Sequence, residues 1–103
     1  MIPTFELLAE PSRRRILDLL RDGERSVGEL VDRLHMSQPA VSKHLRVLRD
    51  SGLVDVRVDA QRRLYRLRPE PLREVDAWLS PYRRLWEDRL DRIERHLQAT
   101  PDT

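Results

Sequence analysis

The side chains in this sequence that could do chemistry lie on one edge of a predicted helix, and their chemistry is hydrogen bonding rather than catalysis. Residues 37–52, SQPAVSKHLRVLRDSG, begin with a serine suited to cap a helix and end on a glycine suited to stop one. Val41, Leu45 and Leu48 share one narrow arc of that helix, which predicts a core-facing side. The other edge is polar and free of acidic residues until Asp50; it comprises Ser37, Gln38, Pro39, Ser42, Lys43 and Arg46. Glutamine and lysine can bond to base edges, and serine to bases or phosphates, so this polar edge is a candidate surface for reading DNA.

The elements before the polar edge decide between that interpretation and an ordinary solvated helix face. Ser26 followed by Glu29 forms a predicted capping box, and apolar residues recur at helical spacing behind it. A link of about three residues, which includes His35, separates this helix from the next. Two capped helices joined by so short a turn predict a helix-turn-helix, whose second helix enters the major groove amino end first. Two earlier helices are expected, one over Thr4–Ala9 and one that starts at Pro11.

After Gly52 the apolar period changes from helical to alternating. Valines alternate with polar residues over residues 54–59, and a second extended run covers residues 63–67 beyond a polar turn. This pattern predicts a two-stranded hairpin with a basic tip, which makes the domain a winged helix-turn-helix. Arg62 and Arg63 are the candidate wing contacts to DNA, and Arg57 is a weaker candidate.

The last helical region carries a long apolar stripe that keeps its phase across Pro81. We expect either one bent helix or two nearly collinear helices there, because proline removes one backbone hydrogen bond. Aromatic residues on the stripe could line a ligand pocket, but at helical spacing they favour a dimer interface. We predict one domain over residues 1–98 and a flexible tail over residues 99–103. The predicted interface residues are Phe5, Leu8, Leu79, Tyr82, Trp86, Leu90, Ile93 and Leu97.

Three segments resemble the ArsR (ArsR/SmtB-type) winged helix-turn-helix transcriptional regulators: FELLAEPSRRRILDLL, SVGELVDRLHMSQPAVSKHLRVLRDSGLV and RRLYRL. The resemblance covers about residues 4–97. It implies a mostly α fold with a small β-hairpin, and homodimers that pair through their first and last helices. It further implies that two reading helices sit on a pseudo-palindromic operator in double-stranded DNA and repress until a ligand or signal, here unknown, releases them. By position in the motif, Gln38, Ser42 and Lys43 correspond to the base-reading surface of the family.

The chain departs from the metal-sensing members of that family. It contains no cysteine, and the stretch GELVDRL therefore lacks thiolate ligands. The terminal helix has one histidine, His96, and no second ligand pair at the spacing that zinc requires, so we expect neither a metal nor a cofactor. Its acids are expected to pair with neighbouring arginines at helical spacing; the acids are Asp88, Asp91 and Glu94, and the arginines are Arg84, Arg89, Arg92 and Arg95.

Composition and motifs exclude other classes of protein. Charged residues make up 37% of the 103-residue chain and acidic residues begin at Glu6, so we expect a cytoplasmic protein without a signal peptide or membrane span. No catalytic triad or phosphate-cradling glycine loop is present, which argues against an enzyme. A winged-helix module that binds protein remains the alternative, although its surface should be apolar where this one is polar. His44 lies at the margin of the apolar arc, and helix packing is favoured for it over a base contact.

Overall fold

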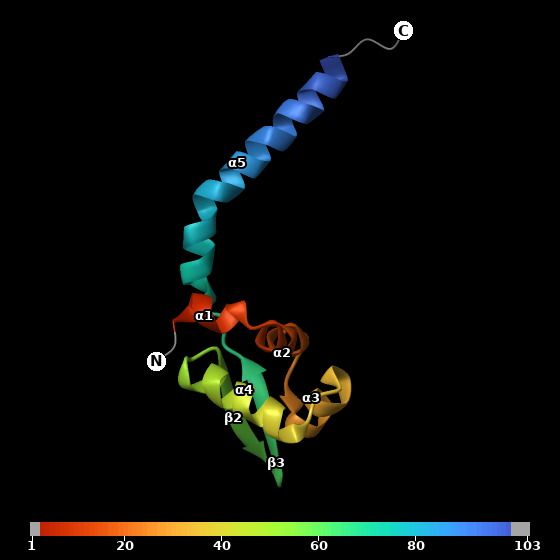
Figure 1. Ribbon diagram of the computed structural model, residues 1–103, viewed down its shortest axis with the longest axis vertical. Helices are drawn as coiled ribbons and strands as arrows, with labels where there is room; N and C mark the ends of the chain where they lie inside the picture. The colour runs from red at the N-terminus through yellow and green to blue at the C-terminus, as the bar shows by residue number, and fades with distance from the viewer. Residues whose placement is uncertain (1–2, 100–103) are drawn as a thin grey trace. The chain divides into compact units, whose positions relative to one another are not determined.

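The structure, a computed structural model, describes residues 3–99 (Figure 1). The chain divides into two compact units, Met1–Arg73 and Glu74–Thr103. The elements run in the order α1 (Thr4–Ala9), α2 (Pro11–Arg21), β1 (Arg25–Ser26), α3 (Val27–Leu34), α4 (Gln38–Asp50), β2 (Val54–Asp59), β3 (Arg62–Leu67) and α5 (Leu72–Ala99). The first unit therefore holds everything up to the start of α5.

Local signals in the sequence set the ends of α3 and α4. The capping box is confirmed, because the Ser26 hydroxyl accepts a hydrogen bond from the Glu29 amide while the Glu29 carboxylate accepts one from the Ser26 amide. The α3 helix ends at Leu34, and its C-cap is His35, whose φ of 54° is left-handed. Ser37 then caps α4 by accepting a hydrogen bond from the Ala40 amide at 3.3 Å. Gly52, with φ of 80°, lets the chain leave α4 in a conformation that other residues rarely adopt.

One hydrophobic core holds the helices of the first unit against the sheet. The inner faces of α2, α3 and α4 supply most of it, and Leu7 of α1, which the sequence analysis did not single out, is fully buried. The buried core residues are Leu7, Ile16, Leu17, Leu20, Leu30, Leu34, Val41, Leu45, Leu48, Leu53 and Val54. The predicted inner arc of α4 is thereby confirmed, and its polar edge faces away from the core.

The sheet has three antiparallel strands in the order β1-β3-β2, so the expectation of a two-stranded hairpin was incomplete. The two residues of β1 pair with β3, Arg25 opposite Tyr65 and Ser26 opposite Leu64. Too short to show any period, β1 could not be recognised from alternation. It braces the middle of β3, and the distal ends of β2 and β3 reach beyond the helices (Figure 1).

The described part of the second unit is helix α5 from Glu74 onward, which passes through Pro81 without a break. Of the two arrangements expected at that proline, a single helix is the one found. Helix α5 ends at Ala99, the first residue of the predicted tail over residues 99–103, and residues 100–103 lie outside the described residues. No helix within residues 3–99 is both long and apolar enough to cross a membrane.

Candidate nucleic-acid interface

The amino-terminal half of α4 presents the predicted reading surface. Gln38, Pro39 and Lys43 are exposed, and Ser42 is half-buried. Pro39 stands in the first turn, where its missing N–H costs no helical hydrogen bond. Ser37 is also exposed but uses its hydroxyl as the helix cap. The first two turns of α4 therefore offer amide, ammonium and hydroxyl groups to an approaching partner.

His44 lies on the flank of α4 rather than on this surface. Its ring is half-buried, and its Nδ1 accepts a hydrogen bond from the Arg13 Nε of α2 at 3.5 Å. Burial, followed by the positive charge of Arg13, lowers the pKa of His44 below its ordinary value. The neutral imidazole thus helps pack α4 against α2, as the sequence favoured.

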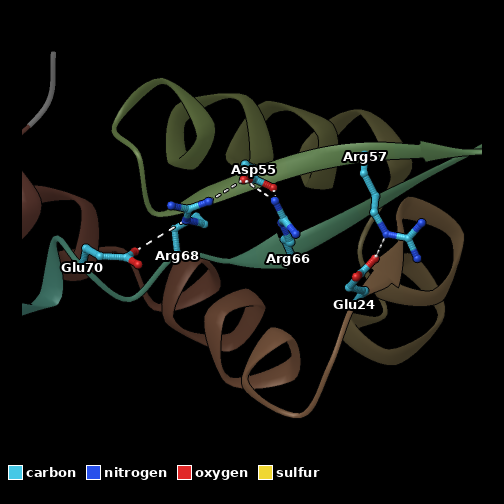
Figure 2. Close-up of polar contacts among 6 residues, drawn as sticks. All are labelled: Glu24, Asp55, Arg57, Arg66, Arg68 and Glu70. Atoms are coloured by element: carbon cyan, nitrogen blue, oxygen red, sulfur yellow. Dashed lines mark hydrogen bonds and ion pairs between the residues drawn. The ribbon is translucent and has the colours of Figure 1, made fainter.

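One face of the hairpin is neutralised by ion pairs. The Asp55 carboxylate accepts hydrogen bonds from Arg66 Nε at 2.6 Å and from Arg68 Nη1 at 3.1 Å, and these contacts, Arg66 first, lower the pKa of Asp55 (Figure 2). Arg57 Nε donates to Glu24 at 2.6 Å. Arg57, the weaker wing candidate, is therefore held by a carboxylate from the link before β1.

The two stronger wing candidates lie on opposite faces of the hairpin, because successive residues of a strand alternate. Arg62 lies directly across from Asp59, and their charged groups are 3.9 Å apart. Arg63 lies across from Val58 on the other face. Within residues 3–99 no carboxylate or other side chain makes an ion pair or hydrogen bond with the Arg63 guanidinium.

A groove separates the outward side of α4 from β3. Its volume is about 380 Å³, and its walls include Ser42 and Arg46 of the polar edge together with Arg63 of the wing. The structure therefore brings two residues of the predicted reading helix together with one of the predicted wing. Arg49 and Tyr65 line the same groove, although the sequence analysis named neither. The sequence shows the i, i+3 spacing of Arg46 and Arg49, but it does not show which strand these two residues face.

Helix α5 carries an apolar stripe that the single chain leaves in contact with solvent. Of the predicted interface residues on this helix, Leu79 is half-buried and five are exposed: Tyr82, Trp86, Leu90, Ile93 and Leu97. On α1, Phe5 is exposed and Leu8 is half-buried. The rings of Trp78 and Tyr82 pack together at 5.0 Å between centroids.

The polar side of α5 pairs differently from the expectation. The ion pair on the described part of this helix joins Arg83 to Asp76, whereas Arg84 donates to the Ser80 hydroxyl and Arg95 to the Asp91 carbonyl. The predicted pairing of Asp88, Asp91 and Glu94 with nearby arginines is therefore wrong. Across residues 3–99, no group of three or more histidine, cysteine, aspartate or glutamate side chains could hold a metal ion.

A capped helix pair with a polar outer edge, followed by a braced hairpin with an unpaired arginine, defines the class of winged helix-turn-helix DNA-binding regulators. The family described as bacterial regulatory protein, arsR family, matches residues 10–56. The arsenic resistance transcriptional regulator ArsR1 of Pseudomonas putida is 40% identical, with 75% of this chain and 70% of the relative covered. The transcriptional activator HlyU of Vibrio cholerae is 44% identical over 80% of this chain and 73% of its own.

Solved structures of similar proteins support the same class. A crystal structure of a possible transcriptional regulator for arsenical resistance is 40% identical and superposes with a TM-score of 0.71, covering 98% of this chain and 100% of that one. A homodimeric winged helix-turn-helix DNA-binding domain of Mycobacterium bovis is 32% identical, with a TM-score of 0.62 over 75% of this chain and 71% of that one. The chain belongs to the arsR family of bacterial regulatory proteins. It is a DNA-binding transcriptional regulator, not an enzyme.

Proposed function

We propose that this protein is a dimeric, sequence-specific repressor that occupies a pseudo-palindromic operator in double-stranded DNA. The observation that carries the proposal is the chemistry of the first two turns of α4. Gln38 can bond an adenine edge in two places and Lys43 can bond guanine acceptors, while Ser42 can serve either a base or a phosphate. A surface built to bind protein would expose apolar side chains at this place instead.

The apolar stripe of α5 supports the dimer. Trp86 is 54% exposed and Leu90 64% exposed in the single chain, which leaves large apolar side chains in water at every turn. A second copy of the same helix would cover such a stripe symmetrically. The similar winged helix-turn-helix domain of Mycobacterium bovis is homodimeric. Two copies would place their α4 helices on half-sites one helical turn, or a multiple of it, apart.

Repression follows from occupancy of a promoter by such a dimer. The transcriptional repressor SdpR of Bacillus subtilis is 29% identical, covering 73% of this chain and 83% of its own length. HlyU is named an activator although it shares the same domain. The direction of regulation therefore depends on where the operator lies relative to the promoter, and repression is the outcome when the two overlap.

The test begins with selection of bound duplexes from a random pool, followed by footprinting of the selected site. A palindromic consensus is expected. Lys43→Ala and Gln38→Ala should each weaken binding to that site by about 5- to 150-fold, which corresponds to about 1 to 3 kcal/mol for a lost base contact. The matched control is Arg21→Ala, an exposed residue at the end of α2, which should bind as the wild type does. Equal affinity of all four proteins for consensus and scrambled duplexes would refute sequence-specific binding through α4.

A further inference from the structure

The groove between α4 and β3 is built from one helical face and one strand face. Arg46 and Arg49 lie one turn apart on α4, and Arg63 and Tyr65, two residues apart, point to the same side of β3. Both pairs line the groove, with the buried Leu45 at its floor. The two walls belong to the same compact unit, so the groove needs no second chain to form.

The groove carries positive charge that the protein does not neutralise. None of the guanidinium groups of Arg46, Arg49 and Arg63 makes an ion pair or hydrogen bond with another side chain in the described part of the chain. Among the described residues that line the groove, Asp50 is the one acid. Three guanidinium groups against one carboxylate, in a recess about 380 Å³ in volume, favour an anion with several acceptor oxygens.

The position of the groove along α4 indicates which anion. Arg49 follows Gln38 by eleven residues, which is about 16 Å of helix axis at 1.5 Å per residue. The major groove of B-DNA is about 12 Å wide, so a helix that places Gln38 on the bases carries Arg49 beyond the base edges. In B-DNA the sugar-phosphate backbone borders the major groove at that distance from the bases. A guanidinium at that place meets phosphodiester oxygens rather than bases.

We propose that this groove holds one backbone phosphate of the DNA strand that passes between α4 and the wing. Arg49 and Arg63 bind the phosphate from opposite walls, and the Tyr65 hydroxyl is a third donor. The inference rests on the proposed function and adds to it a phosphate site that fixes the docking of α4, independent of base sequence. Arg49 is thereby assigned a contact to DNA on a part of α4 that faces no base.

The first test is the salt dependence of binding by Arg49→Gln, with Arg21→Gln as the matched control on an exposed site outside the groove. Each lost phosphate contact should lower the slope of log K against log salt by about 0.9 per protomer bound. If the variant and the wild type bind equally at 1 M salt, this difference in slope makes the variant's affinity at 0.1 M salt about 8-fold lower than that of the wild type, per protomer. The loss should be equal for the selected operator and for a scrambled duplex. Arg63→Gln should behave in the same way, and Arg49→Lys should recover most of the slope.

The second test replaces single phosphates of the operator by uncharged methylphosphonates. At one position per half-site, the substitution should weaken the wild type but not Arg49→Gln, because the variant has already lost that contact. An unchanged salt slope for Arg49→Gln, or a loss confined to the operator, would overturn the phosphate assignment while wild-type binding still upheld the proposed function. Saturable binding of inorganic phosphate to the free protein below 1 mM, unaffected by duplex DNA, would instead show a small-anion site and also overturn it.

Discussion

Leu45→Ala tests whether the reading surface depends on the core beneath it. Leu45 is 1% exposed and lies in the hydrophobic cluster between Val41 and Leu48. Truncating a leucine so completely buried removes apolar contacts and leaves a cavity, for which losses of about 2 to 5 kcal/mol are typical. A domain of this size has a free energy of unfolding of about 5 to 15 kcal/mol, so the loss is a large share of the total.

Urea unfolding followed by circular dichroism measures this loss. The two proteins must be compared at equal protomer concentration, because association stabilises a dimer by mass action. The midpoint should fall while the slope m is unchanged, since the surface exposed on unfolding is nearly the same. DNA affinity, corrected for the unfolded fraction, should stay close to that of the wild type.

Arg46→Ala, one residue further along α4, is the matched control. Arg46 is exposed, and its side chain makes no ion pair or hydrogen bond within residues 3–99, so its loss should change the free energy of unfolding by about 0.5 kcal/mol or less. Its DNA affinity should nevertheless fall. If both variants lost stability equally, or if Leu45→Ala cost less than about 1 kcal/mol, the division of α4 into a core side and a DNA side would be refuted.

Three further predictions concern the dimer, the pH dependence and the turn after α4. Trp86→Ala should shift sedimentation toward the monomer, and an unaltered dimer would remove this residue from the interface. The lowered pKa of His44 means that the unfolded chain binds a proton more readily than the folded one. The free energy of unfolding should therefore decline as pH falls below about 6.5. This decline should be smaller in His44→Gln when urea midpoints are compared at pH 7.5 and 5.5. Gly52→Ala should lower stability by about 1 kcal/mol because φ at this position is 80°. In Gly28→Ala the added Cβ would meet only Ser26 Oγ, at 3.9 Å, so this variant should not be destabilised. Thermal melts of both variants and the wild type measure the difference.

The sequence predicted those parts of the fold that rest on signals within a few residues. The capping box at Ser26, the cap at Ser37 and the stop at Gly52 are local, and the structure confirms all three. The strand β1 was missed because two residues carry no period, and its pairing with β3 joins segments about 40 residues apart. The helix through Pro81 was left open because a proline can either bend or divide a helix, and the sequence does not say which.

The site was predictable one element at a time but not as an assembly. Helical spacing placed Gln38, Ser42 and Lys43 on one edge of α4, since that inference needs only the pitch of a helix. Predicting the groove also requires knowing how α4 packs against the sheet, which is why the sequence analysis did not identify Arg49 and Tyr65. Sequence reasoning therefore identified the polar amino-terminal end of α4 and missed the residues that line the groove with β3.

The pairing of charges on the hairpin separates arginines that look alike in the sequence. Arg57 and Arg66 lie on the face where Glu24 and Asp55 hold them, and Arg62 has Asp59 opposite. Such exposed pairs contribute little to stability because water screens them, so stabilising the fold is a poor explanation for them. Their larger effect is to cancel positive charge on the face away from α4, so the uncancelled charge of the wing lies on the groove side. In the proposed complex the DNA strand lies on the side of the wing that α4 faces, and neighbouring arginines of one hairpin have different roles.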